Sequence, residues 1–144
     1  MMNDTRVSYP AGINSSWGAI VDKFTYAIYF LYAQVLLALA KPTRLMILDY
    51  LQSGEKSLGE CAELLRLPDA TIYRHLEDLS AQGIITARWD GFTVLYSLGD
   101  PRIVHACDLL YGFLADREAG NRAFADHLPH ARRLRRVKTA VPPQ

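Results

Sequence analysis

The chain has 144 residues, of which 22% are charged and 50% hydrophobic, and its formal net charge is +1. This length suits one domain with its own core, and the composition excludes a disordered chain. Two cysteines, Cys61 and Cys107, are too few for a disulfide framework or a four-thiolate zinc site, so we expect a reducing, cytoplasmic setting. Positive charge is concentrated in residues 117–144, which carry a net charge of +5.

The N-terminal third of the chain predicts a loose arm over residues 1–14, followed by a long apolar helix from about residue 15 to Ala40. Residues 24–40 carry no charge. This run is close to the shortest length that spans a bilayer, and no polybasic segment flanks it. We therefore expect a helix buried in protein, and no membrane partner.

Three further helices are predicted from capping residues and apolar spacing. Pro42 suits the first turn of the second helix, which should stop at residues 53–54. Ser57 and Glu60 form an S-x-x-E capping box that begins a third, short helix. After a turn at residues 67–69, a fourth helix should end near Gly83. Its buried face is predicted to hold Ile72, Leu76 and Leu79.

The pattern changes after the fourth helix. Two runs of β-branched and aromatic residues, 84–89 and 92–97, flank Asp90-Gly91, a strong hairpin signal. Pro101 then begins a fifth helix, and residues 122–144 form a basic tail. The sequence predicts a mostly α fold with a small β-hairpin (α+β). It is a winged helix-turn-helix domain over residues 15–121, with the element order α-α-α-α-β-β-α.

The fourth helix would be the one that enters the DNA major groove. Its outward face, projected at 100° per residue, begins with small, hydroxyl-bearing and basic side chains that suit base edges and phosphates. These candidate DNA-binding residues are Ala70, Thr71, Tyr73 and Arg74. Glu77 and Asp78 also project outward and would be repelled by phosphate, so the helix is expected to enter tip first.

Residues 36–48 (LLALAKPTRLMIL), 71–76 (TIYRHL) and the hairpin 90–98 resemble the ArsR/SmtB family of bacterial repressors. The resemblance implies a homodimer that binds double-stranded operator DNA and leaves it when a small effector binds. It also implies a DNA-contacting wing at the hairpin, with candidate residues Arg88, Trp89 and Phe92. The wing departs from the family pattern, because Trp89 and Phe92 stand at positions that are often basic.

The metal sites of the family do not carry over. Its zinc ligands would fall on Asp100, Arg102, Phe113 and Asp116, and its arsenical cysteines on Ser57 and Gly59. We therefore predict neither of the family's metal sites and no cofactor. Cys61 and Cys107, with His105, remain candidates for a thiol switch or a soft-metal site. The alternative for both cysteines is simple packing, since free cysteine behaves as a small buried hydrophobe.

The sequence predicts a sequence-specific DNA-binding transcriptional regulator, most simply a homodimeric repressor. It contains no glycine-rich phosphate loop, zincin motif or nucleophile with a base partner, so we do not expect an enzyme. One alternative is a protein-interaction module, whose aromatic wing and apolar first helix bind a partner while DNA binding is weak or absent. Another is a regulator that ignores thiol chemistry and responds to an organic effector or to none.

Overall fold

A computed structural model describes residues 23–118 and 120, and the predicted arm (1–14) and basic tail (122–144) lie outside these residues. The chain divides into two compact units after Ser97. The first unit contains α1 (Lys23–Leu39), α2 (Pro42–Leu51), β1 (Lys56–Ser57), α3 (Leu58–Leu65), α4 (Asp69–Ala81), β2 (Ile85–Asp90) and most of β3 (Thr93–Leu98). The second contains α5 (Pro101–Arg117).

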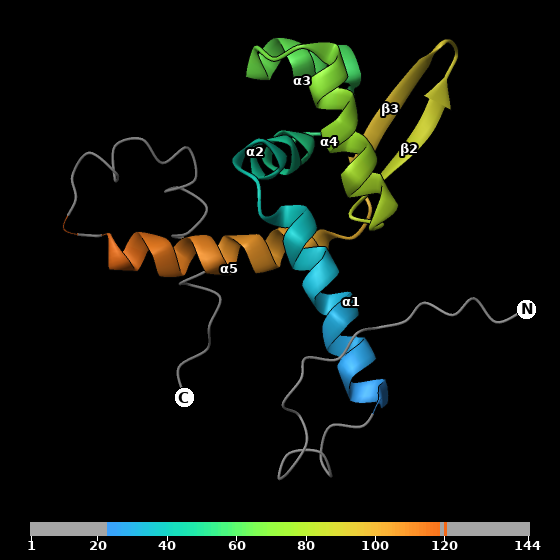
Figure 1. Cartoon of the computed structure of the whole chain (residues 1–144). Helices are drawn as coiled ribbons and strands as arrows, with labels where there is room; N and C mark the ends of the chain where they lie inside the picture. The colour runs from blue at the N-terminus through green and yellow to red at the C-terminus, as the bar shows by residue number, and fades with distance from the viewer. Residues whose placement is uncertain (1–22, 119, 121–144) are drawn as a thin grey trace, which may run out of the picture. The chain divides into compact units, whose positions relative to one another are not determined.

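The core of the first unit lies where α2, α3 and α4 meet the base of the β2–β3 hairpin (Figure 1). The predicted apolar face of α4 is confirmed, because Ile72, Leu76 and Leu79 are all fully buried. Their partners from α2, α3 and the sheet are Ile47, Leu48, Leu51, Cys61, Ala62, Ile84, Ile85 and Tyr96. Burial of one face holds α4 in place and leaves its opposite face free.

The predicted capping box is present at the start of α3. The Glu60 backbone N–H donates to Ser57 Oγ at 3.2 Å, and the Ser57 backbone N–H donates to Glu60 Oε2 at 2.7 Å. At the end of α4, Gly83 has a φ of 67°, a conformation in which a glycine carries no steric penalty. These two local signals fix both ends of the helix-turn-helix segment.

The sheet differs from the expected two-stranded ribbon. Residues 56–57, for which no strand was predicted, form the strand β1, which pairs antiparallel with β3 in the order β1-β3-β2. The hairpin loop is also one residue later than expected, at residues 91–92, since β2 continues to Asp90. Gly91 alone in this loop has a positive φ, 63°, which matches glycine at the first central position of a II′ turn.

Among the described residues, no single helix is long and apolar enough to cross a membrane. Residues 25–39 and α2 reach the length and apolar composition of a membrane span only when they are taken together, and the two helices are bent by 85° relative to each other. The expectation of a buried helix is not met within the single chain, because Ile28, Tyr29 and Leu31 of α1 keep 65–66% of their surface exposed.

In the second unit, Asp100 caps the first turn of α5. Its carboxylate accepts from the Arg102 backbone N–H at 2.8 Å and from the Arg102 guanidinium at 2.6–3.1 Å. The guanidinium, followed by the backbone N–H, lowers the pKa of Asp100 from 3.8 to about 2. The cap therefore favours the ionised carboxylate.

The Asp100 cap should contribute to stability above pH 3.8 and lose that contribution as the pH falls through about 2, because the folded-state pKa is the lower one. NMR titration of the Asp100 carboxyl carbon should give a midpoint of about 2. In Arg102→Ala the midpoint should rise, because the side chain is the larger cause of the shift. A midpoint near 3.8 in the unsubstituted protein would contradict this geometry.

Candidate nucleic-acid interface

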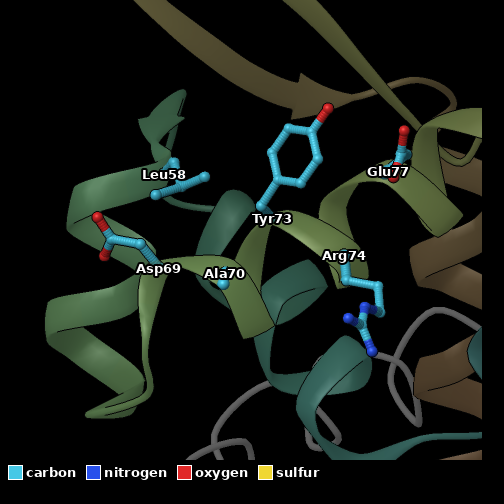
Figure 2. A pocket seen from close by; sticks show the side chains of 6 residues that line it. All are labelled: Leu58, Asp69, Ala70, Tyr73, Arg74 and Glu77. Atoms are coloured by element: carbon cyan, nitrogen blue, oxygen red, sulfur yellow. The ribbon is translucent and has the colours of Figure 1, made fainter.

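The exposed face of the helix-turn-helix centres on the first half of α4. Ala70, Thr71, Tyr73 and Arg74 are all exposed, and Tyr73 keeps 51% of its surface. Three of them, Ala70, Tyr73 and Arg74, border an open hollow of about 480 Å³ together with the start of α3. Figure 2 shows its lining residues, which are Leu58, Asp69, Ala70, Tyr73, Arg74 and Glu77. The candidate DNA-binding residues of α4 thus share one solvent-facing surface.

Arg74 is the exposed cation on this surface. Within the described part of the chain its guanidinium forms no ion pair, and Figure 2 shows it extending away from α4 in a different direction from Tyr73. An unpaired guanidinium can donate two parallel hydrogen bonds to guanine or to a phosphate. Arg74 is therefore available to bind an external acceptor.

The other candidate arginine is engaged within the protein. Arg88 donates from Nε to Glu55 Oε1 at 2.8 Å and from Nη2 to Glu55 Oε2 at 2.5 Å. Its Nη1 also lies 3.8 Å from Asp90 Oδ1. The hydrogen bond from Arg88 lowers the pKa of Glu55, so the carboxylate stays ionised and occupies the fork of the guanidinium. Glu55 precedes β1, 33 residues from Arg88.

The β2–β3 hairpin, called the wing from here on, carries aromatic side chains at its tip. Phe92 lies in the loop and is fully exposed, and Trp89 keeps 73% of its surface. Exposed aromatic side chains suit van der Waals contact or stacking more than phosphate binding. Since Arg88 is paired with Glu55, the wing presents an apolar tip with little free positive charge.

Asp78 is only in part the outward-facing charge that helical projection predicts, because its side chain is 47% exposed but is engaged within the protein. Its carboxylate forms an ion pair with Arg44 of α2, a residue that the sequence analysis did not single out. Only 5% of Arg44 is exposed. Helical projection missed this pair because a polar residue beside the outward face can also reach a neighbouring helix. The signal was a lone arginine among the apolar residues of α2.

The two candidate thiols lie in different units. Cys61 lies on α3 and is completely buried in the core of the first unit, and Cys107 on α5 is half-buried. Burial, as the largest cause, raises the pKa of both thiols. A raised pKa reduces the thiolate fraction at neutral pH and so slows oxidation and metal capture. The structure therefore supports a packing role for Cys61 most directly.

His105 is exposed on α5. Among the residues that the structure describes, no group of three or more His, Cys, Asp or Glu side chains is placed to hold a metal ion. His75, in contrast, accepts a hydrogen bond from Arg44 at 3.4 Å and has a structural position on α4. Burial, with the neighbouring positive charges, lowers its pKa.

Comparison with known proteins matches the helix-turn-helix segment to a family. Residues 41–87, from the start of α2 to the middle of β2, match the family model for bacterial regulatory proteins of the arsR family. Nodulation protein NolR of Rhizobium meliloti is 35% identical over 83 residues, which are 56% of this chain and 68% of that protein. The chain belongs to the ArsR family of bacterial regulatory proteins.

A probable mercury resistance operon repressor of Streptomyces lividans is 38% identical over 82 residues, which cover 57% of this ArsR-family chain and 66% of the relative. The matched segment thus spans about two thirds of the length of these two relatives. A possible ArsR-family regulator from Mycobacterium bovis, solved as a homodimeric winged helix-turn-helix DNA-binding domain, aligns with a TM-score of 0.60 and 26% identity. That alignment covers 76% of this chain and 93% of the other. The predicted fold is confirmed.

Proposed function

We propose that this ArsR-family protein is a homodimeric, DNA-binding transcriptional repressor that reads the major groove with α4. The observation that carries the proposal is Arg74, an exposed guanidinium without an ion pair in the described residues, on the first half of the second helix of the motif. Thr71 and Tyr73, which are also exposed, supply hydroxyl groups from the same half of α4. This combination suits bidentate contact to guanine, flanked by hydrogen bonds to phosphates or base edges.

Dimerisation is supported by α1. Its described residues include large apolar side chains that remain exposed in a single chain, namely Ile28, Tyr29, Phe30, Leu31, Tyr32, Leu36 and Leu37. Contiguous exposed apolar surface of this kind typically marks an interaction site. A second copy would bury it and present two copies of α4 to successive major grooves, as a pseudo-palindromic operator requires.

Release of the DNA by a small effector is part of this proposal. The raised pKa values of both thiols favour an effector other than a thiol oxidant. Treatment with a thiol oxidant should therefore leave DNA binding unchanged, and Cys107→Ser, which removes the less buried thiol, should behave like the unsubstituted protein in that test.

Anisotropy measurements with a fluorescent DNA duplex over a range of salt concentrations test the proposed function. The logarithm of the binding constant should fall linearly with the logarithm of the salt concentration, because each neutralised phosphate releases counterions. Binding that ignores salt, or no binding at all, would overturn the proposal.

A second candidate function is favoured by the exposed aromatic tip of the wing. Trp89 and Phe92 would suit a protein-interaction module in which the wing docks on a partner protein. In that case Phe92→Ala should abolish partner binding, while Arg74→Ala should leave it unchanged. The repressor function predicts the opposite order of effects on operator binding.

Glu55→Gln should strengthen DNA binding several-fold at low salt, because it frees Arg88 to bind a phosphate. The slope of the logarithm of the binding constant against the logarithm of the salt concentration should become steeper by about one, since one more counterion is released. The matched control is the same substitution in an Arg88→Gln background. There, any remaining gain measures only the lost repulsion between Glu55 and DNA. An unchanged salt slope in the single variant would show that Arg88 does not reach the DNA.

A further inference from the structure

Arg44 lies where α1, α2 and α4 meet, and it is the buried charged residue of the described core. Arginine is rarely buried unless its donors are satisfied. Here Nη1 donates to the Ala38 carbonyl oxygen at 2.9 Å, Nε donates to His75 Nδ1 at 3.4 Å, and Nη2 pairs with Asp78 Oδ2. Each of the three guanidinium nitrogens therefore has its own partner.

These partners connect two helices that are distant in sequence. Ala38 belongs to the last turn of α1, where carbonyl groups lack an intrahelical donor and a positive charge is favourable. His75 and Asp78 are three residues apart on one side of α4. The planar guanidinium of Arg44, carried by α2, thus joins the end of α1 to the middle of α4.

Apolar packing between α1 and α4 is incomplete beside this link. A hollow of about 240 Å³ separates Gln34 and Leu37 of α1 from Ala81 and Gln82 at the end of α4, and Arg44 and Asp78 form part of its lining. Hydrophobic contact is non-directional, whereas a guanidinium fixes the direction of each hydrogen bond. The orientation of α4 relative to α1 therefore depends strongly on the polar contacts of Arg44.

We propose that Arg44 is a positioning residue that sets the angle between α1 and the recognition helix α4 through Ala38, His75 and Asp78. The inference rests on the proposed function, in which α1 forms the dimer contact and α4 enters the groove. Under that function, the angle determines the distance between the two recognition helices of a dimer. Arg44 thereby specifies the half-site spacing that the dimer accepts, without touching DNA itself.

The test compares Asp78→Ala with Asp78→Asn in the full chain. Both variants remove the same negative charge from α4, but only asparagine retains an oxygen that can accept from Arg44. The Asp78 side chain is 47% exposed, so both variants are expected to fold. Any difference between them reports the link between the helices and not the change in charge.

DNA binding should separate the two variants by spacing. On a palindrome with the preferred spacing, Asp78→Ala should bind about tenfold more weakly than Asp78→Asn, the order of effect of one hydrogen bond to a charged group. On DNA with a single half-site, the two variants should bind equally. The preference for one spacing over another should also be weaker in Asp78→Ala. Equal losses on the palindrome and the half-site would overturn the proposal, because they would indicate a merely structural role.

A second measurement needs no DNA. Spin labels at two exposed positions, Ala33→Cys on α1 and Glu77→Cys on α4, report the distance between the two helices by pulsed electron resonance. The native cysteines, Cys61 and Cys107, are replaced by alanine so that only these two positions are labelled. Labelled chains are diluted with unlabelled ones so that the distance is measured within one chain. The distance distribution should be narrow with Asp78 or Asp78→Asn and broader or shifted with Asp78→Ala. Identical distributions would overturn the role of Arg44. If the unsubstituted protein binds no DNA but Asp78→Ala still broadens the distance distribution, only the proposed function is overturned.

Discussion

Replacing Arg74 with alanine should weaken binding to the operator by about 1 to 3 kcal/mol, which is roughly 5- to 150-fold. The physical reason is that Arg74 is the exposed guanidinium on the leading half of α4, whereas Arg88 on the wing is already paired with Glu55. Binding to duplexes of unrelated sequence should fall much less, since those contacts depend on charge alone. Anisotropy titrations with operator and scrambled DNA measure both effects.

Arg74→Lys is the matched control for this result. Lysine keeps the positive charge but lacks the planar fork that pairs with two acceptors on guanine. We therefore expect Arg74→Lys to retain most of the binding to scrambled DNA and to lose most of the preference for the operator. If Arg74→Ala binds the operator as tightly as the unsubstituted protein, the assignment of Arg74 to the groove is wrong.

The second large effect concerns stability, and it should separate fold from function on a single helix. Leu76 is fully buried in α4, so Leu76→Ala should lower the free energy of unfolding by about 2 to 5 kcal/mol through lost burial and the cavity left behind. Tyr73, three residues earlier, keeps 51% of its surface exposed. Tyr73→Phe should change the free energy of unfolding by less than about 0.5 kcal/mol.

Urea denaturation at one fixed protein concentration measures both changes, because the stability of a dimer depends on concentration. Operator affinity, corrected for the folded fraction, should show the reverse order. Tyr73→Phe should bind the operator more weakly, whereas the folded molecules of Leu76→Ala should bind it with nearly normal affinity. A Leu76→Ala protein within 1 kcal/mol of the unsubstituted one would contradict the burial of α4. Unchanged operator binding by Tyr73→Phe would exclude its hydroxyl from the interface.

Local chemistry explains which elements the sequence could predict. The capping box at Ser57, the glycine stop after α4 and the apolar spacing of Leu76 and its neighbours each involve residues within a few positions of one another. The strand β1 has no such signal, because two residues become a strand only through pairing with β3 about 40 positions later. The hairpin loop was misplaced by one residue because Asp90-Gly91 and Gly91-Phe92 are both favourable turn pairs.

The candidate interface follows the same division. The exposure of Thr71, Tyr73 and Arg74 agrees with the helical projection of α4. Two features that shape the electrostatics of the interface, the Arg88–Glu55 pair and the Arg44–Asp78 pair, join residues 33 and 34 positions apart. No local pattern identifies such pairs, since each depends on how the tertiary fold brings two elements together.

Selection from a random double-stranded DNA library by the full chain tests the central claim most directly. The account predicts enrichment of an inverted repeat whose two half-sites are centred about one helical turn, or a whole number of turns, apart. Guanine should be enriched at the position that loses its preference in Arg74→Ala. Recovery of unrelated sequences without any repeat would contradict the account, because a dimer that reads DNA through α4 must impose both a sequence and a spacing.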